Sequence, residues 1–122
     1  MISSLSQIVY DRLQLLLSVP LWSEERPQLS GPPYATVRID TVESGQGTAP
    51  IHDLAVEVNC VAPTADAATE IAEEAIGALH DYSAAFGDAR VAGLRNVDSV
   101  RAWDPQTSLW SVTLFFRGVA VA

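Results

Sequence analysis

Residues 103–117, WDPQTSLWSVTLFFR, decide the fold because they join a tight turn to a strand rich in β-forming residues. The turn, Asp104–Thr107, begins with aspartate followed by proline, which is the preference of a type I turn. The flanking alternation predicts a hairpin with one arm over Val91–Trp103, interrupted by Gly93, and the other over Leu109–Val121. Apolar residues occur on both faces of the second arm: Trp110, Val112, Leu114 and Phe116 on one face, and Leu109, Phe115 and Val119, with Thr113, on the other. We therefore expect this arm to be covered on both sides or to contact another subunit.

Two helices and two further strands are expected before the hairpin. The spacing of apolar residues predicts one helix over Ser4–Leu17 and another over Ala65–Tyr82. Alternation predicts strands over Tyr34–Val42 and Leu54–Cys60, and a short strand around Leu21–Trp22 is a further option. The order α-β-β-α-β-β predicts an α+β fold, a mostly antiparallel sheet with two helices packed on it.

Length and composition exclude several classes of protein. The chain has 122 residues and a mass of 13.1 kDa, which predicts a single domain over residues 1–122. Its 15 acidic residues outnumber 7 basic residues, all arginine, so the formal net charge is −8. This balance argues against a general nucleic-acid binder, which needs clustered basic residues. No apolar run approaches the roughly 18 residues that span a bilayer, and no secretory peptide is expected at the N-terminus.

Few residues are arranged for chemistry. Neighbours on a helix or a strand point in different directions, so His80 with Asp81 and His52 with Asp53 are not expected to act as dyads. The single cysteine, Cys60, excludes an internal disulfide and is expected to be a small buried residue. We therefore predict no catalytic residue, no metal site and no cofactor. A small hydrolase that uses Cys60 stays an alternative, and it predicts that Cys60→Ser abolishes activity; otherwise that change should leave assembly nearly intact.

The surplus of apolar residues instead favours an assembly subunit. The polar loop over Glu43–Pro50 carries two glycines and no apolar anchor, which predicts mobility in the free protein and ordering on contact with a partner. Tryptophan is enriched at protein interfaces. The candidate interface residues are Trp22, Glu43, Ser44, Gly45, Gln46, Gly47, Trp103 and Trp110.

Several segments together resemble a known family. They are the N-terminal helix Ile2–Leu17 with the proline-rich crossing after it, the strand Pro33–Ile39, the alanine-rich helix that starts with Thr64–Glu74, and the hairpin stretch Trp103–Arg117. Over nearly the full chain this pattern resembles the tail terminator, or tail completion, proteins of long-tailed phages and of phage-like gene transfer agents.

The resemblance implies a structural virion protein without enzymatic activity. It implies a homo-oligomer, usually a ring of six copies, on the head-proximal end of the tail tube. Its partners would be the tail tube protein and the head–tail connector or stopper, at the neck of a virion assembled in a bacterial cytoplasm. DNA would pass through the ring without specific binding, and a negative lumen would repel its phosphates. Two alternatives stay open: another neck component, such as a connector or stopper, and a non-viral α+β domain with a concave ligand pocket.

Overall fold

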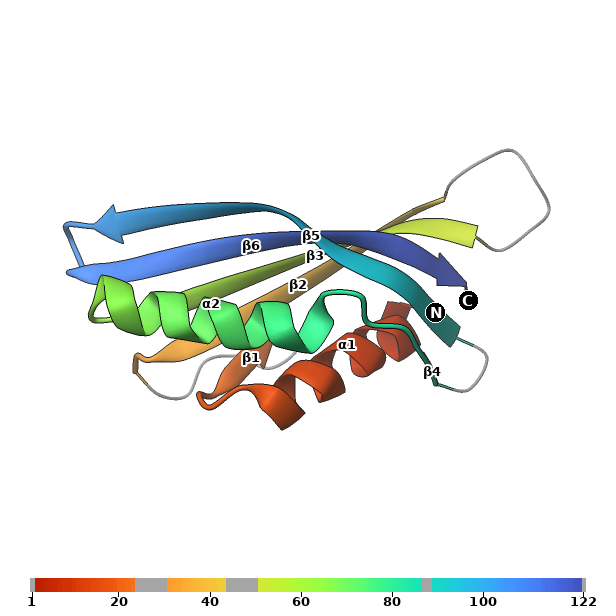
Figure 1. The fold of residues 1–122 in the computed structure, drawn as a ribbon, viewed down its shortest axis with the longest axis horizontal. Helices are drawn as coiled ribbons and strands as arrows, with labels where there is room; N and C mark the ends of the chain where they lie inside the picture. Colours follow the sequence, from red (N-terminus) through yellow and green to blue (C-terminus); the bar gives the residue numbers. More distant parts are fainter. Residues whose placement is uncertain (1, 24–30, 44–50, 87–88, 122) are drawn as a thin grey trace.

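The computed structural model describes residues 2–23, 31–43, 51–86 and 89–121, which form one six-stranded sheet and two helices. The elements are α1 (Ile2–Leu16), β1 (Leu21–Ser23), β2 (Tyr34–Glu43), β3 (Ile51–Ala62), α2 (Ala65–Leu79), β4 (Ala84–Phe86), β5 (Ala89–Asp104) and β6 (Leu109–Val121). The strand order is β1-β2-β3-β6-β5-β4, and both helices lie against the same face of the sheet (Figure 1). Neighbouring strands are antiparallel except β1, which runs parallel to β2. The predicted α+β class and the order of the main elements are confirmed.

Two short strands add to the six predicted elements. The optional strand around Leu21–Trp22 exists as β1, whereas β4 was not predicted. It forms because α2 ends at Leu79, before the predicted end at Tyr82. The backbone of His80 is extended and Asp81 has a φ of +62°, so the chain leaves the helix and turns back along β5. The other end of α2 is as expected, since the Thr64 hydroxyl accepts a hydrogen bond from the Ala67 N–H at 3.1 Å.

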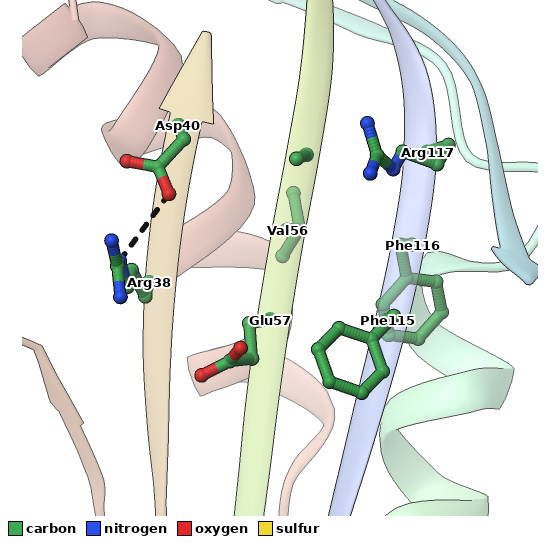
Figure 2. A pocket seen from close by; sticks show the side chains of 8 residues that line it. Arg38, Asp40, Val56, Glu57, Phe115, Phe116 and Arg117 are labelled. Carbon is green, nitrogen blue, oxygen red and sulfur yellow. Dashed lines mark ion pairs between the residues drawn. The ribbon is translucent and has the colours of Figure 1, made fainter. Parts of the chain in front are cut away.

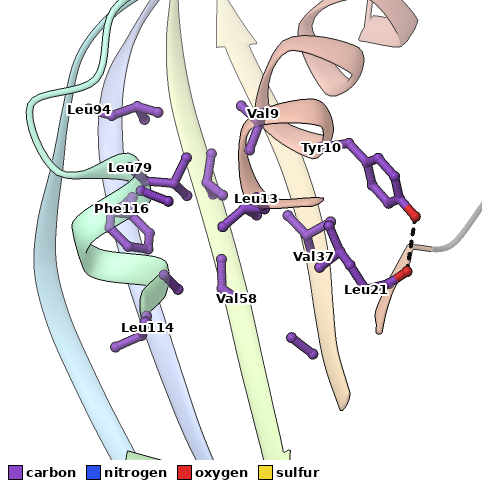
Figure 3. Close-up of a cluster of buried hydrophobic side chains, with 14 of the residues drawn as sticks. Val9, Tyr10, Leu13, Leu21, Val37, Val58, Leu79, Leu94, Leu114 and Phe116 are labelled. Atoms are coloured by element: carbon purple, nitrogen blue, oxygen red, sulfur yellow. Dashed lines mark hydrogen bonds between the residues drawn. The ribbon is translucent and has the colours of Figure 1, made fainter. Parts of the chain in front are cut away.

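The core fills the space between the sheet and the two helices. Val9 and Leu13 of α1 and Leu79 of α2 meet the side chains that β3 and β6 direct toward the helices, which include Phe116 (Figure 3). The Tyr10 hydroxyl donates a hydrogen bond of 2.9 Å to the Leu21 carbonyl, which ties α1 to the edge of the sheet. The alternation read from the second hairpin arm is therefore right for the face that carries Val112, Leu114 and Phe116.

The hairpin β5–β6 is long, and its turn is one residue longer than predicted. Ser108 has a φ of +57° and its N–H donates to the Asp104 carbonyl at 2.8 Å, while β6 spans Leu109–Val121 as predicted. The aspartate also caps the turn, because its Oδ1 accepts from the Gln106 N–H at 2.9 Å. At the other end of β5, Gly93 has a φ of +62° and lies in a register shift.

Candidate assembly interface

The face of the sheet opposite the helices has no helix over it in the described part of the chain. Phe115 and the charged residues Arg38, Asp40, Glu57 and Arg117 line a hollow of about 260 Å³ on this face (Figure 2). Arg38 and Asp40 form an exposed ion pair, with 3.2 Å between Nε and Oδ2. The hollow is smaller than the roughly 300–1,000 Å³ of ordinary small-molecule pockets. It therefore gives little support to a ligand-binding domain.

One edge of the sheet, along β5, is covered over only part of its length. The chain after α2 follows this edge: the Asp81 N–H donates to the Leu94 carbonyl at 2.6 Å, and the Asn96 N–H donates to Nδ1 of His80 at 3.1 Å. β4 pairs with β5 only at Ala89–Val91. Farther along, residues 99–104 pair with β6 on one side and with no described strand on the other. Among the described residues, the last six of the sixteen residues of β5 therefore have an outer side that is open to another strand.

Exposed apolar side chains accompany the open part of β5. All residues from 97 to 104 are exposed, and Val97, Val100 and Trp103 have 57%, 50% and 50% of their surface accessible. The Trp103 ring lies 6.4 Å from that of Trp110, which is partly buried against the core. In Figure 1 this part of β5 forms the edge of the sheet, with β6 between it and α2. A partner would cover side chains that a monomer leaves in water.

The opposite edge, along β2, is covered in the same partial manner. β1 pairs with β2 only at Ala35–Val37, so residues 38–43 have no described strand on their outer side. The covered part of β2 lies at its start and the open part at its end, as in β5. Within the described part of the chain, each edge of the sheet thus has a short strand beside the first part of its edge strand and no strand beside the last six residues.

The candidate interface residues are distributed over both edges. Trp103 and Trp110 come together on the hairpin, whereas Trp22 lies on β1 at the far edge. The indole Nε1 of Trp22 is buried without a hydrogen-bond partner among the described residues. Glu43 is the last residue of β2, while Ser44, Gly45, Gln46 and Gly47 lie outside the described residues.

Sequence reasoning missed the exposed pair Val97 and Val100, and it did not identify β2 as an open edge. The two valines break the strict alternation of β5, and that irregularity was the available signal. A second apolar feature, at the end of α1, followed from the leucine-rich pattern: Leu15 is 75% exposed and Leu16 is 43% exposed.

The candidates for chemistry have ordinary structural roles. His80 and Asp81 do meet, with 3.6 Å between Nε2 and Oδ2, so the expectation that they point apart was wrong. It assumed that both residues are helical, whereas the helix ends before them. His80 also accepts the Asn96 N–H, which makes it a link to β5. Cys60 is fully buried, and burial, with a smaller contribution from Glu74, raises its pKa to about 12. A thiol with this pKa is protonated at neutral pH and is a poor nucleophile.

No three His, Cys, Asp or Glu side chains in the described ranges gather closely enough to hold a metal ion. Neither described helix has the length and apolar character that a bilayer-spanning helix requires.

Comparisons with known proteins found similar folds among solved structures. No protein-family model and no curated protein matches the chain. One chain in the solved virion of a native gene transfer agent particle has a similar fold, with a TM-score of 0.77. The alignment covers 93% of this chain and 92% of that chain at 15% sequence identity. Since similarity at this level shows the fold alone, the chain shares its fold, over nearly its whole length, with a component of that particle.

Proposed function

We propose that this protein is a structural virion component that forms a ring at the head-proximal end of a phage or gene-transfer-agent tail tube. In this role the ring ends tube growth and joins the tail to the head connector or stopper. The observation that carries the proposal is the fold shared with a chain of a gene transfer agent virion over 93% of this protein. The two sheet edges support the same role, because among the described residues each is paired over only part of its outer side and can accept a neighbouring strand.

The mechanism is surface complementarity between unlike patches of identical copies. The open part of β5 and the open part of β2 lie on opposite edges of the sheet, so a contact between them is heterologous. Heterologous contacts generate a ring when the rotation from one copy to the next closes. The number of copies, six by resemblance, then follows from the angle between neighbours.

The acidic surplus has a role in the same proposal. Exposed carboxylates occur on the outer side of α2, at Asp66, Glu70 and Glu73, and others lie on the sheet. A ring with net charge −8 per copy repels DNA phosphates, so the genome passes without adhering to the wall. Replacing exposed carboxylates by amides should then slow DNA delivery while particle assembly stays normal. Unchanged delivery would count against this part of the proposal.

Electron microscopy of particles from a producer that lacks this gene tests the function. Overlong or detached tails beside filled heads are expected, and a plasmid copy of the gene should restore normal particles. Normal particles from the deletion strain would overturn any role in the virion. Empty or leaking heads with tails of normal length would overturn the terminator role and assign the protein to the connector or stopper.

A further inference from the structure

We propose that neighbouring copies join edge to edge, with residues 99–104 of β5 adding as an antiparallel strand to residues 38–43 of β2 in the next copy. This inference rests on the proposed ring, because it specifies the contact between its copies. Each of the two open segments is six residues long, and each begins where a described strand or linker stops covering the edge. Strand addition to an exposed edge satisfies backbone groups that otherwise face water.

The direction of the strands fits a pure rotation between copies. Within one copy β2, β3, β6 and β5 alternate in direction, so β2 and β5 are antiparallel to each other. A second copy, placed beside the first in the same orientation, therefore presents its β2 antiparallel to β5. The helices of both copies then lie on the same side of one continuous sheet, and no copy needs to be inverted.

The register is fixed by the two faces of the sheet. Trp103 pairs with Trp110 on the helix side, and Ile39 packs against the core on that same side. Arg38 lies on the helix-free face, and the alternation along β5 puts Asp104 on that face as well. When Asp104 is opposite Arg38, Trp103 is opposite Ile39. An ion pair and an apolar pair thus form side by side.

The neighbouring registers are less favourable than the proposed one. They differ from it by two residues, because a shift of one residue would place each side chain opposite residues of the other sheet face. A step in one direction puts Asp104 opposite Asp40, so two carboxylates face each other. A step in the other direction puts Asp104 opposite Thr36, where Trp22 of β1 already pairs. Charge complementarity and the position of β1 therefore select a single register.

The same register produces the strand tilt that a closed sheet needs. Inside one copy, the strand pairing across β3 and β6 places Arg38 of β2 at the same level of the sheet as Asp98 of β5. Between copies Arg38 is level with Asp104, an offset of six residues or about 20 Å. Each copy contributes four strands to the continuous sheet, a width of about 19 Å. The strands are then tilted by about 45° to the ring axis, at the upper end of the roughly 35–45° found in closed barrels.

Cysteine trapping of the purified protein tests the contact. In a Cys60→Ala background, Ala102→Cys and Asp40→Cys are directly opposite across the proposed junction, so mild oxidation of the double variant should link most of the protein into a ladder of covalent multimers. Either cysteine alone should give no multimers. The control pair Ala102→Cys with Arg38→Cys lies two residues out of register and should link far less. Equal linking of the control pair, or a double variant that stays monomeric at high concentration, would overturn the proposal.

A further variant distinguishes the proposed β5–β2 junction from a two-fold contact between the β5 edges of two copies. Val100→Cys alone, in the same background, should remain monomeric after oxidation, because the proposed junction pairs residue 100 with residue 42. Efficient dimer formation by this variant would overturn the heterologous contact, since it would put two β5 strands side by side.

Charge reversal gives an independent readout in the purified protein. Asp104→Arg or Arg38→Asp alone should raise the concentration for half-maximal assembly about tenfold or more, because repulsion replaces attraction at every junction. The double reversal should recover most of the loss. Asp66→Arg, with the same charge change on α2, is the control that should leave assembly unchanged. Absence of recovery in the double reversal would contradict the Asp104–Arg38 pair.

The experiments can refute the proposed junction and the proposed function independently of each other. A cross-linked ladder from a protein whose deletion leaves tails normal would refute the tail role and keep the junction. Overlong tails from the deletion strain, together with an unlinked double variant, would refute the junction and keep the tail role.

Discussion

The thiol of Cys60 connects burial with the pH dependence of stability. Its pKa is about 12 in the folded protein and about 9 when the chain is unfolded. Since the folded value is the higher one, this group contributes its full stabilisation below about pH 9 and loses it as the pH rises toward 12. We expect the free energy of unfolding to fall more steeply between about pH 9 and pH 11 in the natural protein than in Cys60→Ala. Denaturant titrations of both proteins measure this, and parallel pH profiles would contradict it.

Two glycines give opposite predictions for the same substitution. A Cβ on Gly118 would lie 3.0 Å from the Ala92 carbonyl oxygen and 3.2 Å from the Leu94 Cα, both backbone atoms that cannot move aside cheaply. Gly118→Ala should therefore lower the free energy of unfolding by about 1–3 kcal/mol. Gly77 in α2 has open space around it, so Gly77→Ala should raise it by about 0.5–1 kcal/mol through helix propensity. Equal effects of the two changes in thermal unfolding would show that the packing at Gly118 is looser than described.

At the scale of the element, α2 depends on one cap at its first turn. Thr64 is the N-cap residue, and its hydroxyl accepts a hydrogen bond from the Ala67 N–H. Thr64→Ala should cost about 1 kcal/mol, whereas Thr64→Ser should cost little because serine keeps the acceptor. Chemical denaturation of the three proteins provides the comparison. A Thr64→Ser protein as unstable as Thr64→Ala would mean that the hydroxyl is not the cap.

The main elements could be predicted from sequence because each has a strong periodic signal. Both helices and the long hairpin follow from apolar spacing and from the aspartate–proline turn. The strands β1 and β4 have three residues each, too few for a period to show, and they form because the chain passes along an existing edge. The meeting of His80 and Asp81 was missed for a related reason, since it depends on where α2 stops.

The candidate interface was less predictable, because an open edge is a property of the whole sheet. Sequence reasoning named Trp103 as a candidate interface residue, and half of its surface is exposed in the structure. It had no means of showing that, among the described residues, β1 pairs with β2 only at Ala35–Val37, since that depends on how far β1 extends. The role of these residues in an interface is therefore still a prediction.

At the scale of the whole molecule, the two hairpin tryptophans should separate assembly from stability. Trp103 is half exposed and Trp110 is packed against the core, although the rings are neighbours. Trp103→Ser should weaken assembly and change the free energy of unfolding of the monomer by less than about 1 kcal/mol. Trp110→Ser should destabilise the monomer by about 2 kcal/mol or more. Sedimentation and denaturant unfolding measure the two effects, and a Trp103→Ser protein that assembles normally would contradict the assignment.

The bulge at Gly93 has a consequence for the fate of misassembled protein. A left-handed residue with a register shift sets the local twist of β5 just before residues 99–104, and in the proposed junction that twist determines the angle at which the next copy is held. A head-to-tail contact with the wrong angle never returns to its starting point, and it grows into an open filament. If copies join as proposed, the geometry of a few residues around Gly93, outside the proposed junction, decides whether they form a closed ring or an insoluble fibre.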